Sequence, residues 1–330
     1  MRNKTFLLIV ALLLLTFQSV MAGNENRIGT AGAAELLIPT GSRGTSMGGA
    51  VVANSYGVDA IHWNPAGLAW LEGTEAMASI LPYIADIDVT YLAIGKQIED
   101  FGIVALSVKV VNIGDIEETT EQFPDGTGSI FSPTMAVIGL TFAKAVSTQV
   151  NFGITGRYIR EDIFQVSASG VSFDFGFTYE PRVYGLTLGL AIRNYGPDIV
   201  FSGSGFERAS AGRPLSSTEA GSELPTSIDL GLAYNFLNEG LNSATMSSNF
   251  RSNNLSGDNW NGGMEYVYDE RYSLRAGYLY SNQAQYLYGF SLGAGVSVDL
   301  GEDATVTFEY SWTETQIFND NQYFTVKASF

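Results

Sequence analysis

Apolar and polar residues alternate along most of the chain, and the alternation is clearest in its last eight residues, 323–330. One set of alternate positions there is apolar: Phe324, Val326, Ala328 and Phe330. The set between them is mostly polar: Tyr323, Thr325, Lys327 and Ser329. Because successive side chains of an extended strand point to opposite faces, this pattern predicts a strand with one apolar and one polar face.

The same alternation recurs along the chain and predicts about 14 strands. They cover residues 75–83, 88–97, 102–111, 134–144, 150–160, 168–179, 185–194, 226–236, 244–251, 260–268, 271–281, 288–300, 304–314 and 321–330. If both termini are periplasmic, the periplasmic turns are short, and the outer loops include the two longest connections, 112–133 and 195–225. An even number of strands with short turns at one end and long loops at the other is typical of a transmembrane antiparallel β-barrel.

A soluble β-sandwich also alternates, so the two architectures have to be separated by what each face carries. In a sandwich the bulky residues would all be buried, and the surface would show mostly Gly, Ala, Ser and Thr, which is unusual for a soluble protein. In a membrane barrel, lipid contacts the bulky face and the lumen is lined by small and polar groups. A tyrosine cluster near strand ends fits the interfacial girdle of such a barrel: Tyr266, Tyr268, Tyr272, Tyr278, Tyr280, Tyr286 and Tyr288.

The first 22 residues have the features of a secretory signal peptide. Arg2 and Lys4 precede an apolar run over 6–17, and Val20-Met21-Ala22 supplies small residues for cleavage after Ala22. The alternative is an uncleaved anchor, but about 12 apolar residues fall short of the roughly 20 that a membrane-spanning helix needs. We therefore expect export, and localisation in a bacterial outer membrane.

Composition excludes several functional classes. The formal net charge of −17 argues against a nucleic-acid partner, because a phosphate backbone requires a basic surface. The chain has no cysteine and a single histidine, His62, from which no catalytic triad or histidine metal site can be assembled. We therefore expect a protein that is not an enzyme and that has no metal and no cofactor.

Residues 23–74 do not alternate and are rich in small residues. We expect them to form a plug, or hatch, with short helices inside a barrel that spans 75–330. Ser42, Thr45 or Ser46 is expected to cap a helix that runs to about Asn54.

Within this segment, residues 44–53 read Gly-Thr-Ser-Met-Gly-Gly-Ala-Val-Val-Ala, and residues 59–68 read Asp-Ala-Ile-His-Trp-Asn-Pro-Ala-Gly-Leu. Both stretches resemble the N-terminal signature of the PorV/PorQ family, within the wider FadL-like outer-membrane group. The resemblance covers roughly residues 29–70, and its most specific part is Trp-Asn-Pro-Ala-Gly-Leu at 63–68. It implies a monomeric 14-stranded barrel with an N-terminal hatch.

The resemblance also implies one of two functions. PorV-type proteins serve type IX secretion by holding secreted protein cargo and passing it to an attachment complex. FadL-like proteins admit long-chain fatty acids or other hydrophobic small molecules. The PorV-type sequence of residues 44–68 favours protein export or cargo attachment, with hydrophobic-compound transport as the alternative. The other expected partners are outer-membrane lipid and the barrel-insertion machinery.

Three groups of candidate functional residues follow. The hatch motif comprises Asp59, His62, Trp63, Asn64, Pro65, Ala66 and Gly67. It is either a turn that gates a passage or a structural turn in which Asn64 caps backbone donors. The C-terminal stripe, which resembles the signal read by the insertion machinery, comprises Tyr323, Phe324, Val326 and Phe330. The charges predicted to face the lumen are Arg157, Asp174, Arg193, Asp229, Arg275, Asp299, Glu309 and Lys327, together with Lys109 and Glu265. These charges either pair with one another and with the hatch or line an ion-selective pore.

Overall fold

The computed structural model describes residue 23 and residues 25–181, 183, 185–210, 213–216, 221–283, 286–301 and 304–330. The predicted signal peptide, 1–22, lies outside the described residues.

Fourteen antiparallel strands form one closed barrel, as the alternation predicts. In chain order they are β1 (Thr74–Pro82), β2 (Asp88–Ile98), β3 (Gly102–Asn112), β6 (Thr134–Ala145), β7 (Val150–Ile163), β8 (Val166–Tyr179), β9 (Leu186–Tyr195), β14 (Ser227–Glu239), β15 (Asn242–Asn253), β16 (Asn259–Tyr268), β17 (Tyr272–Ser281), β18 (Tyr288–Asp299), β19 (Thr305–Thr315) and β20 (Asn321–Ser329). Each strand pairs with the next, and β1 pairs with β20, which closes the ring.

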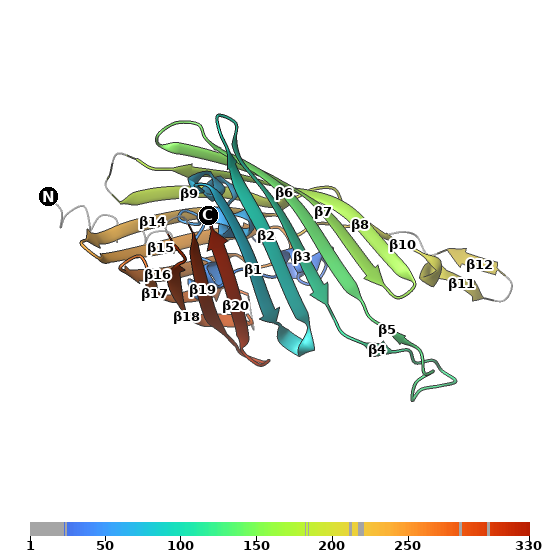
Figure 1. Ribbon diagram of the computed structural model, residues 1–330. Helices are drawn as coiled ribbons and strands as arrows, with labels where there is room; N and C mark the ends of the chain where they lie inside the picture. The colour runs from blue at the N-terminus through green and yellow to red at the C-terminus, as the bar shows by residue number, and fades with distance from the viewer. Residues whose placement is uncertain are drawn as a thin grey trace.

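Short strands extend two of the loops at one end of the barrel, which we call the long-loop end. Strands β4 (Ile116–Glu117) and β5 (Ile130–Phe131) form one hairpin, and β11 (Glu207–Ser210) and β12 (Arg213–Ser216) form another. Both project beyond the barrel on the right of Figure 1, the first lower than the second. Strands β10 (Ile199–Ser202) and β13 (Gly221–Ser222) continue the sheet from β8, and η5 (Ile84–Asp86) and η6 (Ser204–Phe206) are short turns in the loops.

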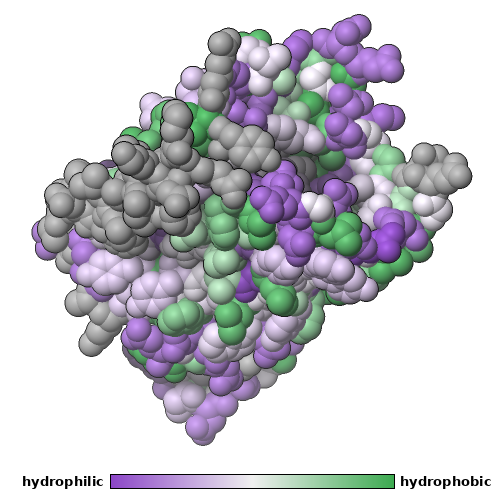
Figure 2. Space-filling view, turned by 90° about the vertical axis from the view of Figure 1, so that its left-hand side faces the viewer, coloured by the Kyte–Doolittle hydropathy of each residue, from purple (hydrophilic) through white to green (hydrophobic). Residues whose placement is uncertain are grey.

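The two faces of the wall differ as the sequence predicts. On β20, the outward residues Phe324 and Val326 are 50% and 42% exposed, whereas the inward residues Thr325 and Lys327 are 2% and 8% exposed. The outer surface therefore offers a largely apolar face to lipid. On the face drawn in Figure 2, hydrophobic residues lie mainly across the middle. Among the described residues, no helix combines the length and apolarity needed to span a membrane.

The segment before β1 lies inside the ring of strands (Figure 1), and we call residues 25–73 the plug. It contains six short helical turns: η1 (Glu25–Arg27), η2 (Ala34–Leu37), α2 (Ser42–Ser46), η3 (Gly57–Asp59), α3 (Ala60–Trp63) and η4 (Pro65–Trp70). The expectation of a helix running to Asn54 is wrong, since α2 ends at Ser46, and Gly48 and Gly49 follow with φ of 62° and 78°. Gly41, rather than a hydroxyl side chain, is its N-cap.

The plug runs from one end of the barrel to the other. Arg27 pairs with Glu223 at the long-loop end, whereas the backbone N–H of Thr74 donates to the carbonyl of Phe330 at the opposite end. The first described residues therefore lie at the end of the barrel opposite the C-terminus. The strands run as predicted, because the start of β1 and the end of β20 lie side by side at the end of the barrel opposite the long loops.

Small wall residues let the plug backbone approach the barrel closely. A Cβ atom on Gly277 of β17 would lie 2.1 Å from the carbonyl carbon of Met47, and one on Gly189 of β9 would lie 2.4 Å from the carbonyl oxygen of Val52. Glycine is the residue that permits such backbone contact. Around it, apolar plug residues pack on the wall, including Val58, Ile61 and Leu68.

Candidate functional site

A continuous set of buried charges joins the plug to the barrel wall. Arg43 of α2 donates from Nε and Nη2 to the two carboxylate oxygens of Glu265, at 3.0 and 2.7 Å. Arg275 connects Glu265 to Glu309, with N–O distances of 2.6 and 2.9 Å. Lys327 then lies 3.2 Å from Glu309 and 2.7 Å from Asp59 of the plug. Buried charges are tolerated only when paired in this way, so the network holds the plug in one position.

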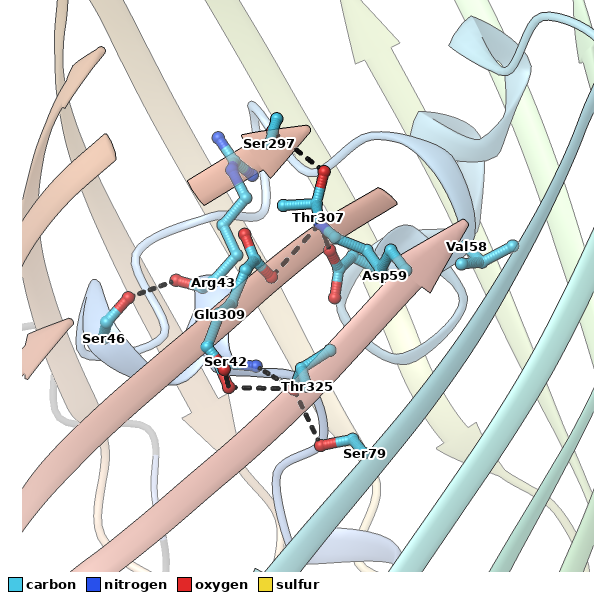
Figure 3. A network of polar contacts seen from close by, with 12 residues as sticks. Ser42, Arg43, Ser46, Val58, Asp59, Ser79, Ser297, Thr307, Glu309 and Thr325 are labelled. Atoms are coloured by element: carbon cyan, nitrogen blue, oxygen red, sulfur yellow. Dashed lines mark hydrogen bonds and ion pairs between the residues drawn. The ribbon is translucent and has the colours of Figure 1, made fainter. Parts of the chain in front are cut away.

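Hydroxyl groups add a second set of plug–wall contacts. Ser42 Oγ and Thr325 Oγ1 are 2.8 Å apart, and Thr325 Oγ1 donates to Ser79 Oγ at 2.9 Å (Figure 3). One turn later, Thr45 Oγ1 lies 2.7 Å from Ser311 Oγ. All five side chains are buried, which strengthens these hydrogen bonds.

The predicted hatch motif forms a turn that ties three segments together. Asn64 Oδ1 accepts from the N–H of Ala66 at 3.1 Å, and Nδ2 donates to the carbonyls of Val52 and Phe177 at 2.7 and 3.2 Å. Pro65 occupies the first position of η4, where its missing N–H has no cost. A Cβ on Gly67 would lie 2.0 Å from the carbonyl oxygen of Ser55, so the turn is packed tightly.

His62 and Trp63 of α3 are buried and face a group of cationic wall residues. Their rings meet edge-on at 4.9 Å, and Arg193 Nη2 lies 3.4 Å from His62 Nε2. Burial, and then the positive charges of Arg193, Lys109, Arg157 and Arg251, hold the pKa of His62 well below its ordinary value. His62 is therefore neutral near pH 7. Among the described residues, no three histidine, aspartate or glutamate side chains are grouped as a metal ion requires.

The structure brings together most of the predicted lumen charges. Arg157 donates to Asp174 at 2.8 Å, and Asp229 accepts from Arg251 at 2.6 Å. Arg275, Glu309 and Lys327 belong to the network around Arg43. Lys109 donates to the plug carbonyls of Glu35 and Ile38, at 3.1 and 2.8 Å.

Asp299 is the exception, and its assignment to the lumen is wrong. It is the last residue of β18, its side chain is 49% exposed, and it pairs with Arg271 in the neighbouring turn at 3.0 Å. Alternation gives the face on which a residue lies but not its depth, and this position is already at the rim. In the C-terminal stripe, Phe324, Val326 and Phe330 are exposed on the outer surface, while Tyr323 is buried in the lumen.

Two adjacent cavities lie between the plug and the wall. The mouth cavity, about 430 Å³, lies at the long-loop end, and the inner cavity, about 80 Å³, reaches His62 and Trp63. They share the lining residues Leu37, Arg251, Tyr286 and Tyr288. The expectation that the last two belong to the interfacial girdle is wrong, because they line these cavities; Tyr288 Oη is bonded to Tyr83 Oη at 2.6 Å.

The wall beside the inner cavity is incompletely paired. The ladder between β17 and β18 begins at Tyr272 and stops at the Tyr278–Phe290 pair, although β17 continues to Ser281. Leu279 and Gly289, on the two sides of this unpaired end, both line the inner cavity. A bulge between Tyr288 and Ser291 on the other side of β18 adds to the irregularity. We call this the β17–β18 seam.

Solved structures with similar folds are outer-membrane channels and transporters. They include a FadL homologue from Pseudomonas aeruginosa, with a TM-score of 0.56 and 15% identity over 88% of this chain and 98% of that chain. The P. putida toluene transporter TodX matches with a TM-score of 0.55 and 15% identity over the same shares of the two chains. The CymD monoaromatic hydrocarbon channel has a TM-score of 0.54 at 15% identity, over 89% of this chain and 98% of that chain. At this identity the likeness establishes the fold alone.

No curated protein matches the sequence. The model of the family described as "Type IX secretion system protein PorV" matches residues 21–255, which include the whole plug and the first nine strands of the barrel. This confirms the resemblance drawn from residues 44–68 and, with the barrel, the outer-membrane localisation. The chain belongs to the PorV family of outer-membrane β-barrel proteins.

Proposed function

We propose that this protein is a non-enzymatic component of protein export, and that it holds secreted cargo at the outer face of the membrane while its plug stays docked. The proposal is supported chiefly by the buried network from Arg43 through Glu265, Arg275 and Glu309 to Lys327 and Asp59. Displacing the plug would separate Arg43 from Glu265 and Asp59 from Lys327, and breaking buried ion pairs is strongly unfavourable. A lumen closed in this way is suited to a binding role rather than to an open passage.

The outer hairpin of residues 113–133 is the best candidate for cargo contact. It carries apolar side chains in exposed positions, with Phe123 and Ile130 exposed by 60% and 65%. It also carries five carboxylates and no basic residue: Asp115, Glu117, Glu118, Glu121 and Asp125. Exposed apolar groups on a hairpin that projects from the membrane favour a role in binding another protein.

The test is to delete the gene in the source bacterium and to measure both protein secretion and uptake of hydrophobic compounds. Secretion should be lost, and the intact gene should restore it. A variant in which 115–131 is replaced by a short turn should fail to restore secretion, although its heat-modifiable gel mobility shows a folded barrel. Normal secretion with lost uptake in the deletion strain would contradict the proposal.

A second candidate function, transport of hydrophobic compounds, is favoured by one specific observation. The unpaired end of the β17–β18 seam lies beside the inner cavity, so a small rearrangement there would connect the cavity to the lipid. If the protein transports hydrophobic compounds, the same deletion strain should lose their uptake, whether or not it also loses protein secretion.

We further propose that the chain acts as a monomer in outer-membrane lipid. Its exposed C-terminal residues, Phe324, Val326 and Phe330, are suited to recognition by the insertion machinery.

A further inference from the structure

Arg193, on β9, is a buried cation that lacks a carboxylate partner among the described residues. Its side chain is 2% exposed, and its one polar contact with a described residue is the 3.4 Å approach of Nη2 to His62 Nε2. Within the described part of the chain, its Nε and Nη1 atoms have no hydrogen-bond acceptor. Because an arginine keeps its proton in a protein, the charge persists and its burial is unfavourable without a compensating group.

Two further donors without acceptors lie next to Arg193. Arg251 of β15 donates to Asp229 from Nε, but its buried Nη2 has no partner in the described structure. Trp63 of the plug has a buried Nε1–H that also has no acceptor in the described structure. The Arg193 guanidinium lies 5.9 Å from the centre of the Trp63 ring. Three neighbouring side chains therefore present unused N–H groups.

The nearest carboxylates in this part of the lumen are paired with cations other than Arg193. Four cations act on His62: Arg193, Lys109, Arg157 and Arg251. Asp174 pairs with Arg157 and Asp229 pairs with Arg251, so both carboxylates are occupied. Lys109 binds plug carbonyls and lies beside the Glu35–Glu161 carboxyl pair. His62 is neutral, and Arg193 is attracted by Asp229 and Asp174 without forming an ion pair with either in the described structure.

Two of the three side chains line the inner cavity, and Arg193, which lines neither cavity, adjoins one of them. Arg251 and Trp63 line the inner cavity of about 80 Å³, and Arg193 packs against the face of Trp63. This volume is enough for a small ion, and the cavity shares four lining residues with the adjacent mouth cavity at the long-loop end.

We propose that Arg193, Arg251 and Trp63 form a binding site for an oxyanion, a carboxylate or phosphate group, at the inner end of the lumen cavity. The anion accepts hydrogen bonds from these three side chains and supplies the missing negative charge. Because Trp63 belongs to the plug and both arginines belong to the wall, the bound anion also strengthens plug docking. The anion comes either as a free ion or as the head group of an amphiphile whose tail lies in the mouth cavity, among Leu37, Ile38 and Leu287.

The test is isothermal titration calorimetry of the whole folded barrel in a non-ionic detergent, with inorganic phosphate and acetate at constant ionic strength set by sodium chloride. We expect saturable binding at one site by at least one of the two anions. Hexanoate distinguishes the sources: tighter binding than acetate identifies an amphiphile, and equal binding identifies a free ion. Absence of saturable binding of all three anions to the natural protein would overturn the proposal.

Variants locate the site. Arg193→Met should weaken binding at least tenfold, whereas Arg271→Met, at an exposed arginine near the opposite end of the barrel, should leave it unchanged. Trp63→Phe keeps an aromatic ring but removes the N–H, and should weaken binding severalfold. It serves as the deciding variant if Arg193→Met does not give a heat-modifiable, folded barrel. Unchanged affinity in a folded Arg193→Met or Trp63→Phe variant refutes the assignment.

Discussion

Arg43 offers the sharpest test of how the plug is held. Its two hydrogen bonds to Glu265 join side chains that are 2% and 7% exposed. Breaking a buried ion pair by removing one partner costs about 3–5 kcal/mol. In Arg43→Met, Glu265 keeps Arg275 as a partner, so we expect the lower end, about 3 kcal/mol. At about 1.4 kcal/mol per factor of ten, the population of barrels with an undocked plug should rise roughly 100-fold.

Hydrogen exchange measures this change directly. Amides of 44–53 in Arg43→Met should exchange about 100-fold faster than in the natural protein, while strand amides are unaffected. Arg160→Met is the matched control, because Arg160 pairs with Asp162 at an exposed position where an ion pair contributes little. Arg43→Met/Glu265→Gln should recover part of the loss, since it removes the uncompensated carboxylate. Unchanged plug exchange in Arg43→Met would refute the view that this network holds the plug.

Three further predictions concern the plug. Gly277→Ala should weaken plug docking by roughly 1–3 kcal/mol, because the added Cβ would overlap Met47. Limited proteolysis of the plug should detect this change. Gly262→Ala is the control, since its Cβ would meet nothing within 4 Å, and it should leave the proteolysis of the plug unchanged. Asn64→Ala leaves a buried N–H and two carbonyls without their partner, so it should lower the free energy of unfolding by about 1–3 kcal/mol. Denaturant titration measures this change. A loss under about 0.5 kcal/mol, typical of surface changes, would contradict the conclusion that Asn64 holds these three segments together. Burial, and then the charge of Glu161, raise the pKa of Glu35 from 4.5 to about 8. Since the folded pKa is the higher one, this stabilising contribution is complete below pH 4.5 and is lost as the pH rises through 8. Thermal melts between pH 5 and 9 should show this decline, and Glu35→Gln should flatten it; an equal decline in the variant would assign it to another group.

The barrel could be predicted because lipid imposes a strict period of two on every strand. Phe324 and Thr325 differ in exposure as their positions require. The same period predicts that Arg275 and Lys327 face inward, but not which partners they meet.

The site could be predicted only in part, because its partners are far apart in the sequence. Arg43 and Glu265 are separated by 222 positions, and Arg43 lies in a segment without any periodic pattern. Tyr286 lies just before β18, and Tyr288 is its first residue. A bulge at this end of the strand disturbs the alternation. At such positions the side-chain direction depends on tertiary pairing and not on local sequence.

The central claim is that the protein functions in export with its plug docked, and a disulfide lock tests it most directly. The chain has no cysteine, and Thr45 Oγ1 and Ser311 Oγ lie 2.7 Å apart, so Thr45→Cys/Ser311→Cys places two thiols within bonding range. In the deletion strain, this variant should restore secretion to the natural level in its oxidised, locked form. Secretion that is lost in the oxidised form and recovered on addition of a reductant would show that the plug must move, and would contradict the account.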